Sequence, residues 1–378
     1  MKYYLIAGEA SGDTHGANLI KGLIKADPQA SFRFWGGDRM AAAAAGRGNL
    51  VKHYRETSFF GVFDVIRHLP QVFAQLDECK CDILSFAPDV VILIDYPGFN
   101  MRIARFAFRQ KIEVFYYISP KVWAWKERRV EQIRKYVSRL FIILPFEQSY
   151  FAAKGIDAVY EGNPIVDDLA ERLAAIPPKD LFIAENGFGN ENKPIVALLA
   201  GSRKSEILHN LPFMIRLAER MSDCRFVIAG VPWIEESLYR RIMAGSDVTL
   251  MIDKTCQIVK YADAAVVTSG TATLETALIG TPEIVCYRTD PLTVWAGRAV
   301  LKIKFISLVN LIMNREAVTE LIQNDMSVER AESELRNILP GGCRRMQMLS
   351  DYVILRERVG GEGASDRFAA RMFQLLKK

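Results

Sequence analysis

The stretch VTSGTATLETALIGTP, residues 267–282, decides how the second half of the chain folds. An aliphatic run that reads as a strand ends in it, a turn of small and hydroxyl-bearing residues follows at 268–271, and a helix pattern then begins. A strand that passes through a short turn into a helix is the repeating unit of a parallel α/β sheet. The same order recurs along the chain, so the fold is expected to be built from this unit throughout.

Short apolar runs that alternate with longer helical patterns indicate two such sheets. Continuous apolar runs are typical of parallel strands that helices cover on both faces. The first set of predicted strands is 3–7, 90–95, 114–118 and 140–144, and the second is 195–199, 225–229, 248–252, 264–267 and 283–287. The sequence therefore predicts an α/β fold of two Rossmann-like, doubly wound parallel-sheet domains.

The boundary between the domains is expected in the polar stretch IPPKDLFIAENGFGNENKP, residues 176–194. Pro, Gly and Asn are the residues that most often interrupt regular structure. A chain of 378 residues, 50% of them hydrophobic, is long enough for two cores. We predict domains at 1–175 and 176–344, with a helical tail at about 345–378 that can pack back onto the first domain.

Charge and cysteine content argue against several other kinds of protein. The net charge of +5 is too small to indicate a nucleic-acid partner. The six cysteines lack CxxC pairing and are expected to be reduced thiols of a cytosolic protein, with no metal site. The chain begins without a signal segment, and no apolar run approaches the ~18 residues of a membrane span. We therefore expect a soluble or peripheral protein that needs no metal and no cofactor.

Ligands of parallel sheets bind at the carboxyl ends of the strands, so the loops that follow strands hold the candidate sites. The first is GEASGD at 8–13, a glycine-rich turn with Glu9, Ser11, Gly12 and Asp13. It lacks both the GxGxxG dinucleotide pattern and the GK[ST] of a P-loop. We interpret it as a sugar-contacting loop on the acceptor side, and a purely structural turn is the alternative.

The second loop, LIDYPGFN at 93–100, puts Asp95 at the end of an apolar strand. Burial there would raise the pKa of its carboxyl, whereas hydrogen bonds from the turn would lower it. Such a carboxylate can accept a proton from an attacking hydroxyl. The alternative is that Asp95 only caps the turn before Pro97. His15, just past the first loop, is the competing base.

The first of two anion-binding loops in the second domain is LLAGSRKSEI at 198–207. Gly201 and Ser202 form a tight turn that brings Arg203 to a helix N-terminus, where amides and the helix dipole favour negative charge. A guanidinium binds phosphate oxygens well. The alternative is that Arg203 is an ordinary solvated charge.

The second anion-binding loop is the opening stretch. Ser269, Gly270 and Thr271 offer N–H and hydroxyl groups at a helix start, which would suit a diphosphate. Glu275 lies about one turn into the helix, where a carboxylate can accept both hydroxyls of a ribose. Alternatively, Glu275 only balances the helix dipole. Because Arg203 lies on the neighbouring loop, we favour nucleotide binding.

The second domain is thus expected to hold a nucleotide diphosphate, and the first to bind the acceptor and supply a base. This arrangement resembles the metal-independent GT-B glycosyltransferases, in which two Rossmann-like domains face a cleft. Seven motifs narrow the resemblance to the lipid-A-disaccharide synthase family. In chain order they are GEASGD (8–13), GGxxM (36–40), IDxPxFN (94–100), YYxSPxxWAW (116–125), GSR (201–203), SGTATLE (269–275) and SLxN (307–310). Each motif alone is weak, but together and in order they are specific.

The resemblance implies that 2,3-diacylglucosamine is transferred from UDP-2,3-diacylglucosamine to the 6-hydroxyl of 2,3-diacylglucosamine 1-phosphate. Inversion would give a β-1,6-linked disaccharide 1-phosphate and UDP. It implies Asp95 as the general base, Arg203 as the diphosphate contact and Glu275 as the ribose contact. Asn310, in SLxN, is a further active-site candidate without an assigned role. The chain departs from the family at Asn163, where a histidine is expected.

Both substrates carry acyl chains, so the resemblance also implies a peripheral enzyme on the cytoplasmic face of the inner membrane. The aromatic stretch TSFFGVFDVIRHL at 57–69 and the mixed KVWAWKERR at 121–129 suit an anionic lipid surface. The residues expected to contact membrane or acyl chains are Phe59, Phe60, Phe63, Trp123 and Trp125. The alternative is that these aromatic side chains belong partly to the core.

Other functions remain open from the sequence. A nucleotide-sugar 2-epimerase would share the two-domain scaffold but would not explain the lipid-like aromatic stretch. A nicotinamide dehydrogenase is disfavoured because no strand is followed by GxGxxG with an acid ~20 residues later. A non-catalytic lipid- or nucleotide-binding module is a third possibility. It would bind UDP but would produce none when both substrates are supplied. The sequence leaves both a monomer and a homodimer open.

Overall fold

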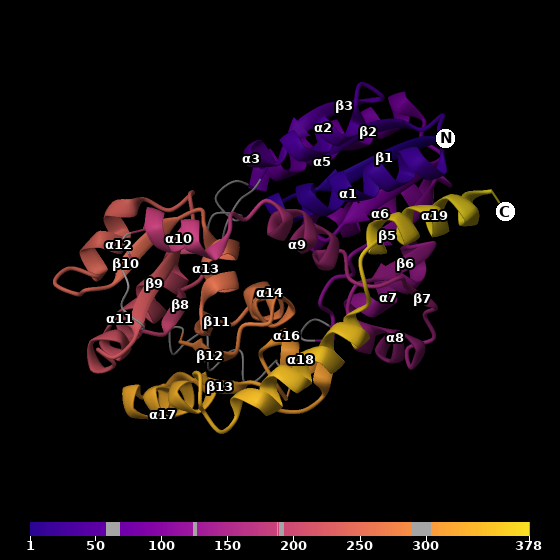
Figure 1. Ribbon diagram of the computed structural model, residues 1–378. Coiled ribbons are helices and arrows are strands. Elements are labelled where there is room, and N and C mark those ends of the chain that lie inside the picture. The colour runs from indigo at the N-terminus through magenta and orange to yellow at the C-terminus, as the bar shows by residue number, and fades with distance from the viewer. Residues whose placement is uncertain (58–68, 124–126, 187, 189–192, 289–303, 378) are drawn as a thin grey trace. The chain divides into compact units, whose positions relative to one another are not determined.

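The computed structural model describes residues 1–57, 69–123, 127–186, 188, 193–288 and 304–377. The chain forms two compact units, Met1–Asp168 with Val359–Lys378, and Leu169–Arg358. Each unit is a parallel sheet with helices on both faces (Figure 1), so the predicted doubly wound α/β architecture is confirmed.

The first unit is built on a seven-stranded sheet in the order β3-β2-β1-β4-β5-β6-β7. All described pairings within it are parallel. Its strands are β1 (Lys2–Ala7), β2 (Ser31–Gly36), β3 (Gly48–His53), β4 (Val90–Ile94), β5 (Glu113–Tyr117), β6 (Arg139–Ile142) and β7 (Ala158–Tyr160). The strand order reverses between β1 and β4, which is where ligands of such sheets bind.

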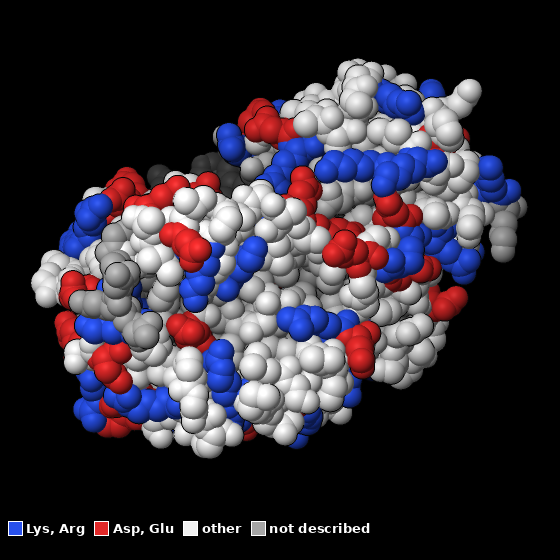
Figure 2. Space-filling model, viewed as in Figure 1, with Lys and Arg blue, Asp and Glu red and all other residues white. Residues whose placement is uncertain are grey.

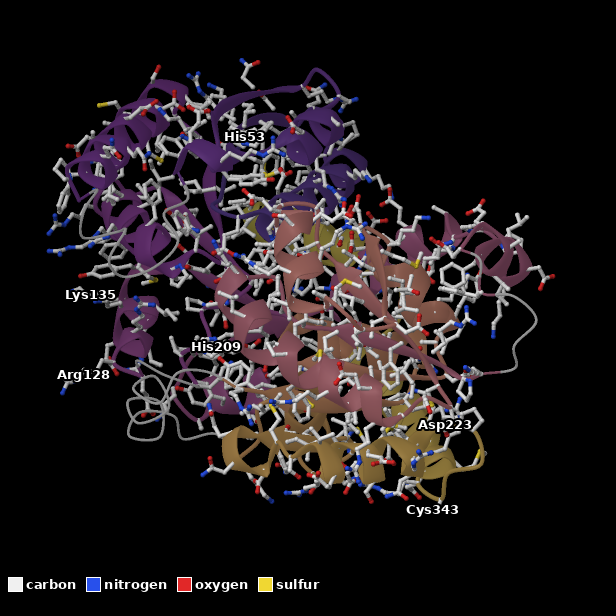
Figure 3. All side chains as sticks on the ribbon, turned by 90° about the vertical axis from the view of Figure 1, so that its left-hand side faces the viewer. His53, Arg128, Lys135, His209, Asp223 and Cys343 are labelled. Atoms are coloured by element: carbon white, nitrogen blue, oxygen red, sulfur yellow. The ribbon has the colours of Figure 1, made fainter. Side chains whose placement is uncertain are left out.

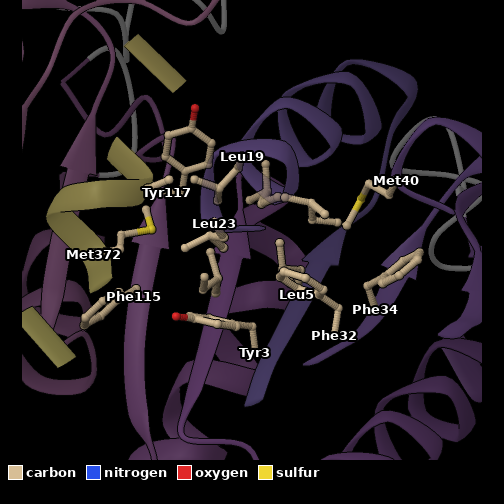
Figure 4. Packing of buried hydrophobic residues seen from close by; sticks show 14 of the residues in the cluster. Tyr3, Leu5, Leu19, Leu23, Phe32, Phe34, Met40, Phe115, Tyr117 and Met372 are labelled. Carbon is tan, nitrogen blue, oxygen red and sulfur yellow. The ribbon is translucent and has the colours of Figure 1, made fainter. Parts of the chain in front are cut away.

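Helices cover both faces of this sheet. They are α1 (Ala10–Ala26), α2 (Asp38–Ala44), α3 (Tyr54–Thr57), α5 (Leu69–Phe86), α6 (Pro97–Arg109), α7 (Arg129–Tyr136), α8 (Pro145–Ala152), α9 (Ile165–Ala174), which continues past the unit boundary, and α19 (Ala364–Leu376). Buried residues of α5, α6 and α7 share one hydrophobic cluster, and those of α1, α2 and α19 share the other. Figure 4 shows Met372 of α19 in the same cluster as Leu19 and Leu23 of α1. The last helix of the chain therefore completes the core of the first unit.

The second unit is built on a six-stranded parallel sheet in the order β10-β9-β8-β11-β12-β13. Its strands are β8 (Ile195–Leu199), β9 (Arg225–Gly230), β10 (Thr249–Ile252), β11 (Ala264–Thr268), β12 (Glu283–Tyr287) and β13 (Thr319–Ile322). Its helices are α10 (Lys179–Glu185), α11 (Lys204–Arg220), α12 (Glu236–Ile242), α13 (Thr255–Tyr261), α14 (Thr271–Ile279), α16 (Leu308–Met313), α17 (Val328–Ile338) and α18 (Arg345–Val359), with a 3-10 turn, η1, at Gln323–Asp325. Here the strand order reverses between β8 and β11.

Every strand predicted from the sequence is present, with ends that shift by two residues at most. Four further strands, β2, β3, β7 and β13, were not predicted. Three of them are edge strands, β3, β7 and β13, and are short or only partly buried. The first unit ends at Asp168, a few residues before the expected boundary at 175. The C-terminal tail is shared between the units: residues up to Arg358 belong to the second unit, and Val359–Lys378 belong to the first.

The surface carries charges of both signs. On the face drawn in Figure 2, lysine and arginine side chains are interspersed with aspartate and glutamate, as expected for a net charge of only +5. Among the described residues, no helix combines the length and the apolar character that crossing a bilayer would require.

Candidate functional site

Asp95 lies directly after β4, at the point where the strand order of the first unit reverses. It and Tyr96 both adopt left-handed backbone angles, with φ of +44° and +47°. Two successive non-glycine residues in this region are energetically unfavourable and need support from their surroundings. That support comes from side chains of neighbouring elements.

Two side-chain hydrogen bonds hold the carbonyl group of Asp95. Its carbonyl oxygen accepts from Nδ2 of Asn100 at 2.8 Å and from the hydroxyl of Tyr116 at 2.7 Å. Asn100 is fully buried in α6 and also donates to the carbonyl of Ile94 at 3.2 Å. The left-handed turn is thus fixed by β5 and α6, and the carboxyl of Asp95 is held at the carboxyl edge of the sheet.

The charge state of Asp95 is perturbed. Burial raises the pKa of its carboxyl to about 6 and outweighs the hydrogen bonding that was expected to oppose it. Lys121 and the backbone N–H of Tyr96 lower this pKa, and Glu9 raises it. A carboxyl with a pKa just below neutral is ionised at pH 7 and still basic enough to take up a proton. By contrast, burial lowers the pKa of His15 to about 4, so that histidine is neutral.

The glycine-rich loop after β1 has two kinds of residue. Glu9 and Ser11 are exposed, whereas Gly12 and Asp13 are buried. The carboxylate of Asp13 accepts backbone N–H groups at the start of α2, from Gly37 at 2.7 Å and from Met40 at 3.1 Å. Asp13 therefore joins the GEASGD and GGxxM motifs, and the sugar contacts of Glu9 and Ser11 stay predictions.

The Tyr96 ring leaves no room for a side chain at position 8, so glycine is needed there. A Cβ atom at Gly8 would come within 2.4 Å of the Tyr96 ring, far closer than atoms can approach. The ring also stacks on Phe99, with 5.5 Å between centroids. The loops after β1 and β4 are therefore fitted closely to each other.

In the second unit, the carboxylate of Glu206 forms hydrogen bonds with the loop that follows β8. Gly201 has φ of +113°, and the helix α11 starts at Lys204, as predicted. The carboxylate of Glu206 accepts the N–H of Ser202 at 3.0 Å and of Arg203 at 3.3 Å, and it pairs with the Arg203 guanidinium at 3.1 Å. The Arg203 side chain is 67% exposed, so this surface pair is weak and can be exchanged for another anion.

The N-terminus of α14 differs from that of α11. Its N-cap is Gly270, which provides no capping side chain. Ser269 turns its hydroxyl aside to the carbonyl of Ile306 at 2.9 Å, and Thr271 is exposed. The buried hydroxyl of Thr268 has no hydrogen-bond partner in the part of the chain that the structure describes. An uncapped helix start with a spare buried hydroxyl is suited to an anion.

Glu275 and Asn310 have partners within the second unit. Glu275 pairs with Arg172 at 3.2 Å and keeps 27% of its side chain exposed. Asn310 is fully buried: its oxygen accepts the N–H of Ala317 at 2.7 Å, and its Nδ2 donates to Glu320 at 2.8 Å. Asn310 therefore supports the loop around it instead of facing a ligand.

Glu320 links Asn310 to the α14 loop. It accepts the N–H groups of Ile306 and Ser307 at 2.9–3.0 Å, and Ile306 in turn accepts the Ser269 hydroxyl. The SGTATLE and SLxN motifs thus form one hydrogen-bonded network. Three supporting residues were not predicted from the sequence: Glu206, Glu320 and Asn100. Of these, only Glu206, three residues after the helix N-cap, has a recognisable capping-box spacing.

The aromatic residues expected at a membrane are only partly described. Phe59, Phe60, Phe63 and Trp125 lie outside the described residues. Trp123 is half-buried, and its indole N–H donates to the buried carboxylate of Glu147 at 3.0 Å.

A family model described as "Lipid-A-disaccharide synthetase" matches residues 3–362. The chain belongs to this family. Among its relatives, the lipid-A-disaccharide synthase of Myxococcus xanthus (strain DK1622) is 37% identical, covering 98% of this chain and 97% of the relative. That of Syntrophus aciditrophicus (strain SB) is 36% identical, covering 99% and 97%. This member of the lipid-A-disaccharide synthetase family is accordingly a glycosyltransferase that forms the lipid A disaccharide.

Solved structures support the fold of this synthetase family member. A UDP-GlcNAc 2-epimerase from Neisseria meningitidis bound to UDP-GlcNAc aligns with a TM-score of 0.65 at 13% identity. A "ugt transferase" from Siraitia grosvenorii in complex with UDP aligns with a TM-score of 0.62, also at 13% identity. Both alignments cover 100% of each chain. At this identity the likeness concerns the GT-B fold alone.

Proposed function

We propose that the protein transfers 2,3-diacylglucosamine from UDP-2,3-diacylglucosamine to the 6-hydroxyl of 2,3-diacylglucosamine 1-phosphate. The products would be a β-1,6-linked tetraacyl disaccharide 1-phosphate and UDP. The observation that carries this proposal is the carboxyl of Asp95, whose pKa of about 6 suits a base at neutral pH. It sits at the strand-order reversal of its sheet, where such folds bind ligands.

In this mechanism Asp95 accepts the proton of the 6-hydroxyl while the hydroxyl oxygen attacks the anomeric carbon of the donor. The bond from that carbon to the UDP oxygen breaks on the opposite side, so the configuration inverts. No covalent intermediate is needed, and one base suffices. The fixed left-handed turn keeps the carboxyl in place, because a base must be held within hydrogen-bonding distance of the proton it removes.

The leaving diphosphate is assigned to the N-terminus of α14. The N–H groups that follow Gly270 and the free hydroxyl of Thr268 would donate to phosphate oxygens. Arg203 would exchange the carboxylate of Glu206 for the diphosphate, a substitution that its exposure allows. These donors stabilise the charge that develops on UDP as the bond breaks.

Glu275 is assigned to the ribose hydroxyls. Its ion pair with Arg172 limits the orientations of the carboxylate, and the exposed part of the side chain is available to the nucleoside. A charged acceptor of this kind can accept both hydroxyl hydrogens of a ribose. Several of the similar folds are described as bound to UDP or UDP-GlcNAc, which agrees with a uridine nucleotide.

We further assign the protein to the cytoplasmic face of the inner membrane as a peripheral enzyme. Arg128 and Lys135, at the two ends of α7, point away from the ribbon (Figure 3) and are exposed. Phe108 is 49% exposed and stands against Tyr136, with ring centroids 5.6 Å apart. Basic and aromatic side chains side by side suit the head-group region of an anionic bilayer.

The test is to incubate the purified protein with both acylated substrates and analyse the products by mass spectrometry. We expect a tetraacyl disaccharide 1-phosphate and an equal amount of UDP. The UDP-sugar alone should remain unchanged over the same period. Epimerised UDP-sugar in that control, without disaccharide in the full reaction, would instead indicate an epimerase.

A further inference from the structure

Lys121 lies in the loop after β5, beside the candidate base. Because β4 and β5 pair in parallel with Ile94 opposite Tyr117, the residues that follow each strand emerge at the same edge. The backbone N–H of Asp95 donates to the carbonyl of Tyr117 at 3.2 Å, which extends this pairing to Asp95 itself. The loop that carries Lys121 therefore begins next to Asp95.

A buried acid fixes this loop on both sides of Lys121. The carboxylate of Glu147, which is 1% exposed, accepts the hydroxyl of Ser119 at 2.9 Å and the indole N–H of Trp123 at 3.0 Å. Ser119 and Val122 are buried and Trp123 is half-buried, whereas Lys121 is exposed. Among residues 118–123 of this loop, the lysine is therefore the one that projects into solvent.

The charges around Asp95 show what this lysine can do. The groups that act on the Asp95 carboxyl are Glu9 after β1, the backbone N–H of Tyr96, and Lys121 after β5. The hydroxyl of Tyr116 donates to the Asp95 carbonyl, and the charge of Arg129, at the start of α7, acts to lower the pKa of this hydroxyl. Within the described residues, the Lys121 ammonium makes no hydrogen bond or ion pair. A substrate phosphate brought close to the two carboxylates would be repelled unless a cation lay nearby.

We propose that Lys121 binds the phosphate of the acceptor sugar next to Asp95. This inference rests on the proposed function, in which the acceptor is a sugar 1-phosphate whose 6-hydroxyl reacts. A flexible ammonium is a strongly hydrated point charge that suits a phosphate dianion. By holding the 1-phosphate, Lys121 orients the sugar so that its 6-hydroxyl reaches Asp95, and it also keeps the carboxylate ionised.

The test compares Lys121→Gln, Lys121→Arg and wild type on two acceptors, the 1-phosphate and the same diacyl sugar without phosphate. Lys111→Gln is the matched control, because Lys111 is an exposed lysine just before the same strand, at the opposite edge of the sheet. For the phosphorylated acceptor, we expect Lys121→Gln to raise KM about 10- to 100-fold, with the donor KM within about twofold. Lys121→Arg should retain most of the affinity, and Lys111→Gln all of it.

With the acceptor that lacks phosphate, wild type and Lys121→Gln should have the same KM. Equal losses on both acceptors would overturn the proposal, as would an unchanged KM for the phosphorylated acceptor. Binding of Lys121→Gln to phosphatidylglycerol vesicles should match wild type; a loss of vesicle binding parallel to the loss of activity would assign Lys121 to the lipid surface instead. If wild type makes no disaccharide, the proposed function itself fails, which is a different result from disaccharide formed with unchanged acceptor KM.

Discussion

Replacing Asp95 by Asn removes the candidate base with little change in shape. Asn is the better choice than Ala because Asp95 has φ of +44°, and Asn tolerates the left-handed region. A positioned general base typically contributes about 10²- to 10⁴-fold to the rate. We expect Asp95→Asn to lower kcat by that factor and to leave UDP affinity unchanged, as measured by initial rates and by UDP titration calorimetry.

The pH dependence gives an independent measure of the same group. With a pKa of about 6, the Asp95 carboxyl is ionised to about 90% at pH 7 and to about 10% at pH 5, by the ordinary titration relation. Only the ionised form accepts the proton. Activity should therefore rise about tenfold between pH 5 and pH 7, with an apparent pKa near 6 on the acid limb.

Asp95→Asn, which should lower activity, should at the same time raise the stability of the folded protein. Burial raises the pKa of the carboxyl in the folded state, so the stability that the protonated group contributes is fully present below the unfolded pKa of ~3.9 and is lost as pH rises through about 6. Ionised Asp95 thus destabilises the native state at pH 8. Asp95→Asn should be more stable than wild type by ~1–3 kcal/mol at pH 8 and equal to it near pH 4, as read from denaturant unfolding.

Either of two results would refute this reasoning. Near wild-type turnover in Asp95→Asn would show that another group takes the proton. An acid limb that stays near pH 6 in the residual activity of Asp95→Asn would show that the titration belongs to a different residue. If Asp95→Asn also lost UDP affinity, the substitution would have damaged the structure. The loss of kcat is evidence for the base only if UDP titration calorimetry gives the wild-type affinity.

Three further substitutions test the rest of the site. Arg203→Ala should raise the Kd for UDP about tenfold with no change in thermal stability, because the guanidinium is mostly exposed; an unchanged calorimetric titration would count against the diphosphate contact. Asn310→Ala should lower the free energy of unfolding by ~2–4 kcal/mol, since it leaves the buried N–H of Ala317 without a partner; wild-type stability in a denaturant titration would contradict the structural role. Gly8→Ala should reduce kcat without weakening UDP binding, because the new Cβ displaces the Tyr96 ring beside Asp95; full activity would remove the need for this contact.

The sequence predicted the central strands well because both of their faces are buried. The runs that became β1, β4, β8 and β11 are almost entirely apolar, and the structure buries nearly all of their residues. Edge strands such as β3 and β13 are only partly buried and carry polar residues, so no apolar run marks them. Position at the end of an apolar strand predicted two opposing effects on the Asp95 pKa, burial and hydrogen bonding, and the structure shows that burial dominates.

The partners of the polar side chains could not be predicted in the same way. Asp13 binds amides that come 24 to 27 residues later, and Asn310 is saturated by a loop that only the fold brings to it. A motif shows that a polar residue is present but not whether its hydrogen bonds are made inside the protein or left for a ligand. Asn310 and Glu275 look alike in this respect in the sequence, yet the polar group of Asn310 is fully buried and that of Glu275 stays partly exposed.

The two helix starts of the second unit explain how anion binding can be divided between them. At the N-terminus of α11, Glu206 accepts the N–H groups of Ser202 and Arg203 and pairs with the Arg203 guanidinium, so a phosphate bound to Arg203 would have to displace this carboxylate. At α14 the capping position is Gly270, and the serine next to it bonds a neighbouring segment instead of the helix. A glycine at the N-cap costs a helix only about a few tenths of a kcal/mol relative to Ser, Thr, Asn or Asp. A diphosphate bound at α14 would satisfy these amides directly, which is why we assign the leaving group to α14 and a supporting role to Arg203.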